Sequence, residues 1–107
     1  MYVEVTLGNG RAVALREPDD FRSFRVVVGG PGGWDDLATA LAGTGRVEPP
    51  HTWIDVDALR GLGPGDDAWV DGLEGMVGYA RQHDWVDASG ALRAHCEWRG
   101  GPPATGR

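Results

Sequence analysis

The sequence contains no lysine, since all ten of its basic residues are arginine. A phosphate-binding loop of the P-loop class ends in lysine followed by serine or threonine, and that continuation is missing. Cysteine occurs once, as Cys96, so no internal disulfide can form and the disulfide framework of small secreted domains is excluded. No apolar run reaches the roughly 18 residues of a membrane-spanning helix. The first residues also lack the apolar core of a signal peptide, so we expect a cytoplasmic protein without a membrane partner.

Acidic residues outnumber basic ones by 16 to 10, which gives a formal net charge of −6. The excess is concentrated in residues 34–87, where eleven acidic residues face three arginines. Proteins that bind nucleic acids neutralise phosphates with basic side chains, so an acidic middle disfavours nucleic-acid binding. The charge pattern instead favours a basic protein partner or contact between copies of this chain.

The strongest helical pattern covers residues 66–83. Its apolar residues share one arc of the helix, namely Trp69, Val70, Leu73, Met76, Val77 and Ala80, and charged residues occupy the other side. Two short helices are predicted over 35–42 and 56–62. We expect Asp35 to cap the first of these, Asp55 or Asp57 the second, and Asp66 or Asp67 the main helix.

Alternating residues predict a hairpin at the start of the chain, with strands over 2–7 and 11–16. A three-residue loop, Gly8-Asn9-Gly10, keeps the branched apolar residues on one face, whereas a two-residue loop would mix the faces. In that register Val3 pairs with Leu15, Val5 with Val13 and Leu7 with Arg11. Further strands are predicted over 24–28, 51–55 (an edge strand), 85–87 and 91–98, with an extended segment over 47–50.

These elements indicate a single α+β domain over residues 1–98, followed by a flexible tail over 99–107. The expected architecture is a small two-layer domain with a mixed or antiparallel sheet of four to six strands. One face of the sheet would be covered by the main helix and the two short helices.

Two strands carry histidine and a carboxylate on the same face: His51 with Asp55, and His95 with Glu97. If the strands are neighbours, these four residues could form an acid/base pair or a metal site with two histidines and a carboxylate. The spacing is generic, however, and a solvated or partner-facing surface is the preferred interpretation, with no metal or cofactor predicted. Cys96 points away from His95 and is interpreted as a buried thiol rather than a nucleophile.

Candidate binding residues come from an aromatic side chain and from glycines. Trp53 lies on the strand face opposite Ile54, and an exposed tryptophan near Arg93 would suit a partner interface. The glycine-rich loop over 29–33 includes Gly30 and Gly32 and is interpreted as a flexible or gating loop. Three glycines also recur in the main helix, at Gly72, Gly75 and Gly78.

Each helical glycine costs about 0.5–1 kcal/mol relative to alanine, so three together require a reason. They would let another backbone approach closely, whether from this chain, from a second copy or from another protein. A bias in genome composition toward glycine and arginine is the competing explanation.

The sequence therefore predicts a small soluble, acidic accessory or interaction protein that binds a protein partner or forms a homodimer. The alternative is a small acid/base enzyme or small-molecule-binding protein of the isomerase, cyclase or lyase type. It would use His51, His95, Asp55 and Glu97, with residues 29–33 as a lid.

Overall fold

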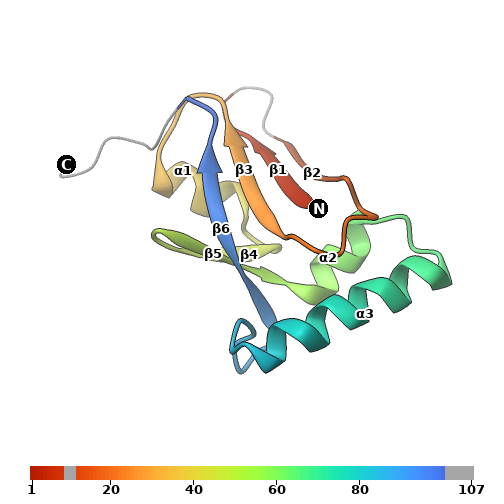
Figure 1. The fold of residues 1–107 in the computed structure, drawn as a ribbon. Coiled ribbons are helices and arrows are strands. Elements are labelled where there is room, and N and C mark those ends of the chain that lie inside the picture. The colour runs from red at the N-terminus through yellow and green to blue at the C-terminus, as the bar shows by residue number, and fades with distance from the viewer. Residues whose placement is uncertain (9–11, 101–107) are drawn as a thin grey trace.

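The computed structural model describes residues 1–8 and 12–100 and shows an α+β fold of six strands and three helices (Figure 1). The strands form one sheet in the order β2-β1-β3-β6-β5-β4. The sheet is mixed, because β1, β3 and β6 run parallel while the other neighbours pair antiparallel. In chain order the elements are β1 (Tyr2–Thr6), β2 (Ala12–Arg16), β3 (Arg25–Gly29), α1 (Trp34–Ala40), β4 (Gly45–Glu48), β5 (His51–Asp55), α2 (Val56–Leu62), α3 (Asp67–Gln82) and β6 (Ala91–Trp98).

The predicted register of the first hairpin is confirmed: Val3 pairs with Leu15 and Val5 with Val13. This register places the branched apolar residues of β1 on the core side, where Val3 and Val5 are fully buried. The predicted pairing of Leu7 with Arg11, and the loop residues Asn9 and Gly10, lie outside the described residues.

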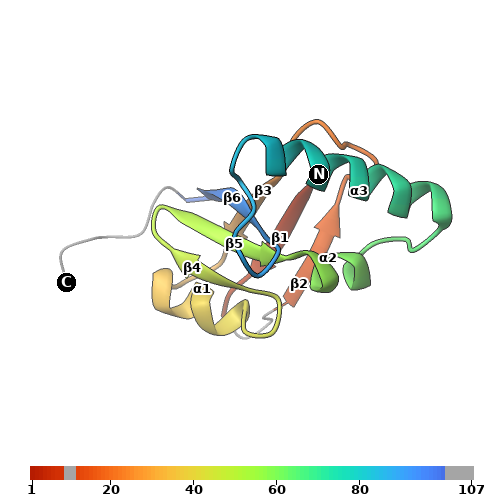
Figure 2. The ribbon, with the colours of Figure 1, turned by 90° about the horizontal axis from the view of Figure 1, so that it is seen from below.

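All three helices contribute to one hydrophobic core on one side of the sheet, and among the described residues no helix covers the other side. In Figure 1, α1 lies behind the sheet and α3 runs across the end at which β6 begins. Figure 2 shows the same arrangement from below, with α2 beside α3. The buried residues of α3 are Trp69, Leu73, Val77 and Ala80, as the apolar arc predicted. None of the described helices has the length and apolar content needed to cross a bilayer.

The predicted edge strand over 51–55 is an interior strand, because β4 pairs with its free side and becomes the edge. The extended segment over 47–50 is also different from the prediction. Its first half belongs to β4, and both prolines lie in the turn between β4 and β5. Proline has no backbone N–H to donate, so a turn is the place where two successive prolines cost the sheet least.

A strand over 85–87 does not form, and a single bridge between Val86 and Leu92 takes its place. The chain there is held by Asp87, whose carboxylate accepts the backbone N–H of Ala91 at 2.9 Å and the hydroxyl of Ser89 at 2.7 Å. Arg46 of β4 donates to the same carboxylate at 2.6 Å. These hydrogen bonds hold the pKa of Asp87 far below its usual range.

For two of the three helices, the residue at the N-terminal cap is one that the sequence predicted. Asp55 caps α2, and Asp66 caps α3 by accepting the N–H of Trp69 at 2.7 Å. The prediction for α1 is wrong, because the helix begins one residue earlier and Gly33 occupies the cap position instead of Asp35. Asp36 reaches back to accept the Gly33 N–H at 2.8 Å.

At the end of β6 the backbone N–H of Arg99 donates to Val28 at 2.8 Å, so pairing with β3 continues by one residue. Residues 101–107, most of the tail expected over 99–107, lie outside the described residues. The division into a domain over 1–98 and a tail stays a prediction.

Candidate functional site

His51 of β5 and His95 of β6 lie directly opposite each other in the antiparallel pairing of the two strands. Both are on the side of the sheet that no described helix covers, where His95 is exposed and His51 is half-buried. The sequence predicted convergence only if these strands were neighbours, and they are. Opposite residues on one face have Cβ atoms about 4.5–5.5 Å apart, so the two imidazoles are within reach of each other.

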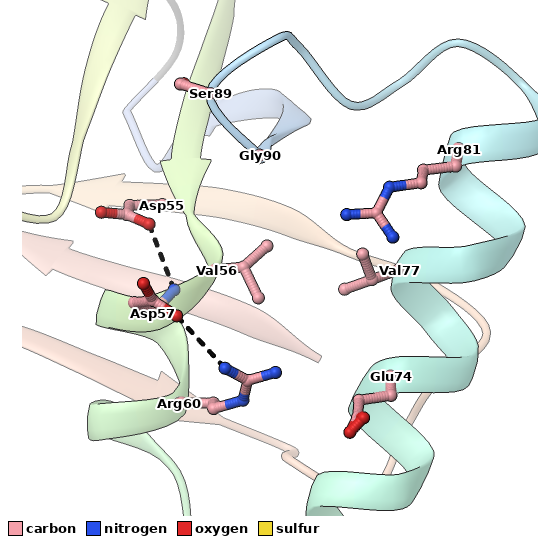
Figure 3. A pocket seen from close by; sticks show the side chains of 9 residues that line it. All are labelled: Asp55, Val56, Asp57, Arg60, Glu74, Val77, Arg81, Ser89 and Gly90. Carbon is pink, nitrogen blue, oxygen red and sulfur yellow. Dashed lines mark hydrogen bonds and ion pairs between the residues drawn. The ribbon is translucent and has the colours of Figure 1, made fainter.

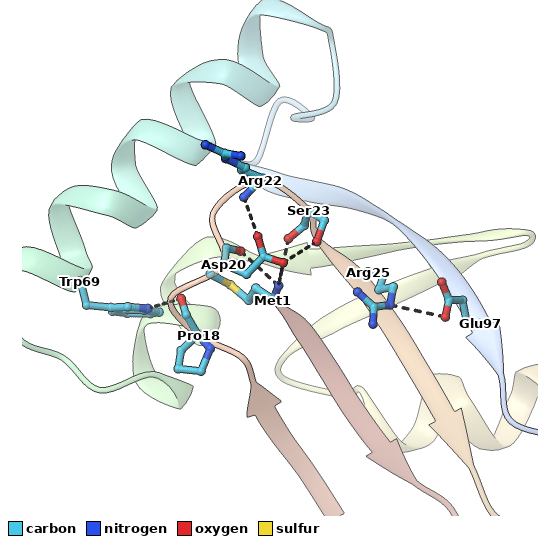
Figure 4. A network of polar contacts seen from close by, with 8 residues as sticks. All are labelled: Met1, Pro18, Asp20, Arg22, Ser23, Arg25, Trp69 and Glu97. Carbon is cyan, nitrogen blue, oxygen red and sulfur yellow. Dashed lines mark hydrogen bonds and ion pairs between the residues drawn. The ribbon is translucent and has the colours of Figure 1, made fainter.

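The two carboxylates of the same predicted set are engaged elsewhere. Glu97 pairs with the guanidinium of Arg25 at 3.4 Å (Figure 4). Asp55 lies at the other end of β5, where it accepts the N–H of Asp57 at 3.1 Å. Within residues 1–8 and 12–100, no group of three or more His, Cys, Asp or Glu side chains is arranged to hold a metal ion. Neither histidine lines any of the main cavities of the described residues, so the two form a pair on the surface of the sheet rather than in an enclosed site.

Trp53 and Arg93 are direct cross-strand neighbours on the same uncovered face. The guanidinium of Arg46 lies over the Trp53 ring at 5.0 Å, and the indole N–H donates to Glu48 at 3.2 Å. Trp53 is half-buried, whereas Ile54 next to it is fully buried, as alternation predicted. Trp53 therefore sits in a polar, arginine-rich surround on the surface of β4, β5 and β6.

Gly30 and Gly32 have positive φ angles of 90° and 138°. A Cβ at Gly30 would meet the backbone of Leu7, and one at Gly32 would meet the side chain of Asp36. Glycine at both positions therefore has a structural reason. Without side chains there, the segment between β3 and α1 can pass close to Leu7 and to Asp36. The binding role that the sequence suggested for them stays a prediction.

The three glycines of α3 have different surroundings. A Cβ at Gly72 would overlap the ring of Phe21, whereas a Cβ at Gly75 or Gly78 would meet nothing within 4 Å. The close neighbour at Gly72 is thus an aromatic ring of the same chain and not another backbone. Gly75 and Gly78 have no such neighbour among the described residues.

Sequence reasoning missed an aromatic cluster at the end of α3. The rings of His83 and Trp85 stack at 4.7 Å with an interplanar angle of 20°, and Tyr79 lies 4.4 Å from His83. Tyr79 is 58% exposed and Trp85 is 37% exposed, and they are the two large hydrophobic side chains exposed in the described part of the chain. The spacing of Tyr79 and His83, four residues apart at the margin of the apolar arc, was the available signal.

A groove runs from this cluster along α3 to the loop between β2 and β3. One section has a volume of about 100 Å³ and the next about 520 Å³. They share Phe21, Arg22, Met76 and Tyr79, so they are adjoining parts of one depression, which we call the aromatic groove. Arg22 contributes positive charge in both sections and Arg93 in the smaller one, and none of the twelve lining residues is acidic. Aromatic residues, methionine and arginine are the types enriched in protein interfaces.

The loop that carries Phe21 and Arg22 is anchored at both ends (Figure 4). The ammonium group of Met1 donates to the backbone oxygens of Asp20 at 3.1 Å and Ser23 at 3.2 Å. The Asp20 carboxylate accepts the N–H of Arg22 and the hydroxyl of Ser23, which lower the pKa of Asp20.

From the other side, the indole N–H of Trp69 in α3 donates to the backbone oxygen of Pro18 at 2.9 Å. The Arg22 guanidinium points toward α3, away from Asp20 (Figure 4). One wall of the groove is therefore held in place by contacts from Met1, the residue before β1, and from α3.

A second cleft, of about 320 Å³, separates α2 from α3 (Figure 3). Arg81 and Glu74 extend into it from α3, and Arg60 from α2, where it pairs with Asp57 at 3.1 Å. Groups of both charges therefore line the same space, together with Asp55. This mixed lining favours neither an anion nor an apolar side chain, in contrast to the aromatic groove.

Cys96 lies on the core side of β6 and is buried. Burial, assisted by the nearby charge of Glu97, raises the pKa of its thiol to about 11. The reactive thiolate is therefore scarce near neutral pH, as expected for a thiol that packs in the core.

Comparisons with protein-family models, with curated proteins and with solved structures find no match for this chain.

Proposed function

We propose that this chain is a non-catalytic interaction protein that binds a protein partner through the aromatic groove and the exposed rings beside it. The observation that carries the proposal is the exposure of Tyr79 and Trp85 next to an apolar depression. Soluble chains bury most large aromatic rings, and exposed clusters of them beside arginine are typical of partner-binding surfaces. Self-association through the same surface is the second form of this proposal. The single buried cysteine supports a cytoplasmic location.

The alternative, an acid/base enzyme, would depend on His51 and His95. Their juxtaposition on neighbouring strands speaks for it. Two observations speak against it. Asp55 and Glu97 both have other partners, and the two histidines lie on the surface of the sheet, whereas an enzyme site needs a concave space around its reacting groups. The aromatic groove offers such a space for binding, but its lining has no histidine, carboxylate or cysteine.

Native mass spectrometry of the protein, isolated gently from its own source, tests this proposal. We expect a complex with a second polypeptide, and a variant that combines Tyr79→Ala with Trp85→Ala should lose it. The matched control combines His51→Ala with His95→Ala, which changes the uncovered sheet face and should keep the complex. A bound metal or small molecule that disappears in the histidine variant would overturn the proposal in favour of the enzyme.

A further inference from the structure

We propose that the occupant of the aromatic groove is an acidic peptide segment of the partner protein, with one bulky apolar side chain among its carboxylates. This inference rests on the proposed function and adds the chemistry of the partner. The apolar side chain would enter the smaller section of the groove, and the carboxylates would face Arg22 and Arg93.

The smaller section has the size of a side chain rather than of a whole ligand. This section measures about 100 Å³, and its lining includes Phe24, Trp85 and the buried residues Ala80 and Leu92. Small-molecule sites measure roughly 300–1,000 Å³, and one liquid water takes about 30 Å³. A single leucine-sized or aromatic group therefore fills this space, where most of the lining residues are apolar or aromatic and Arg22, Ser23 and Arg93 are the polar ones.

The larger section gives room for the backbone on which that side chain is carried. It measures about 520 Å³ and passes over Gly72 and Gly75 of α3. The space above Gly75 contains no other atom of the described chain within 4 Å of the position of a Cβ. A peptide can therefore lie close to the helix at this point, continuous with the side chain in the smaller section.

Charge decides which peptide fits. The chain has more acidic than basic residues, yet the groove has two arginines and no carboxylate. Neither Arg22 nor Arg93 belongs to an ion pair within residues 1–8 and 12–100. Guanidinium groups bind carboxylates through paired hydrogen bonds, so an acidic segment satisfies both arginines while a basic one is repelled.

Selection from a random peptide library displayed on phage tests this inference, with the full-length protein as the bait. We expect the selected peptides to share one bulky apolar residue flanked by aspartate or glutamate. Arg22→Gln and Arg93→Gln should each weaken binding of the selected peptide about tenfold, the usual size of a lost charge-assisted contact. Arg60→Gln, on α2 and outside the groove, is the matched control and should bind like the unmodified protein. Circular dichroism verifies that each variant is folded.

Enrichment of neutral or basic peptides, or binding that Arg22→Gln and Arg93→Gln leave unchanged, would overturn the inference. So would a protein that sediments as a dimer through this groove, because the occupant would then be a second copy. Failure here is distinguishable from failure of the proposed function. If the natural complex is still lost with Tyr79→Ala and Trp85→Ala, the groove binds a partner, but one of different chemistry.

Discussion

Substituting alanine for each glycine of α3 in turn provides a sharp test of how the groove is built. At Gly75 and Gly78 a Cβ meets open space, so alanine should raise the free energy of unfolding by about 0.5–1 kcal/mol through its higher helix propensity. At Gly72 the same gain is opposed, because the new Cβ would overlap the Phe21 ring. Carbon atoms in contact prefer about 3.5–4.0 Å, so the ring must move by about 1 Å. Overpacking of this kind costs about 1–3 kcal/mol.

We therefore expect Gly72→Ala to be less stable than Gly75→Ala by about 1–3 kcal/mol. Urea denaturation followed by circular dichroism measures this difference. It corresponds to a difference in Tm of about 4–8 °C for each kcal/mol in a domain of this size class. In a Phe21→Ala background the new Cβ no longer overlaps a ring, so Gly72→Ala should raise the free energy of unfolding. Equal stability of Gly72→Ala and Gly75→Ala in the original background would refute the packing of Phe21 on α3.

Three further predictions concern caps, pH and the thiol. Asp66→Ala should lower the free energy of unfolding by about 1 kcal/mol, because the N–H of Trp69 loses its acceptor. Urea denaturation measures this loss, and the control variant Asp67→Ala should have a much smaller effect. Asp87 has a lower pKa in the folded than in the unfolded chain, so its stabilising contribution is complete above the unfolded value of about 4 and is lost as the pH falls below it. Asp87→Asn should therefore reduce the loss of stability between about pH 5 and pH 3, and an unchanged pH profile would contradict the assignment. Cys96 should react with iodoacetamide only slowly in the folded protein at pH 8 and rapidly in urea, as followed by mass spectrometry, since its pKa is raised to about 11.

Local patterns predicted the elements of the fold well because they depend on neighbouring residues. The alternation of Val3 and Val5 and the length of the loop determined the register of the first hairpin. The order of the strands does not follow from such patterns. That β5 lies beside β6 depends on long-range pairing that no local signal encodes. The pairing of β4 with β5, by contrast, is a local hairpin across the turn that holds the two prolines.

The candidate site was harder to predict for the same reason. The groove combines a loop before β3, one flank of α3 and the start of β6, which are far apart in the sequence. Tyr79 and Trp85 are the types of residue that usually pack in a core, and only the structure shows that their rings are exposed. By contrast, the pairing of His51 with His95 was predictable in part, because alternation fixed their faces and only the adjacency of the strands was unknown.

The acidity of the chain has a structural cause that changes how it bears on function. Five aspartates accept backbone N–H groups in turns and at the starts of helices: Asp20, Asp36, Asp55, Asp66 and Asp87. A chain with 18 glycines and seven prolines has many such turns, and aspartate is among the side chains best suited to satisfy their free N–H groups. Five of the 16 acidic residues thus serve folding, and the net charge alone is weak evidence for a basic partner. The local charge is more informative, because the residues that line the aromatic groove include two arginines and no carboxylate. The proposal of an acidic partner rests on this local charge and not on the net charge of the chain.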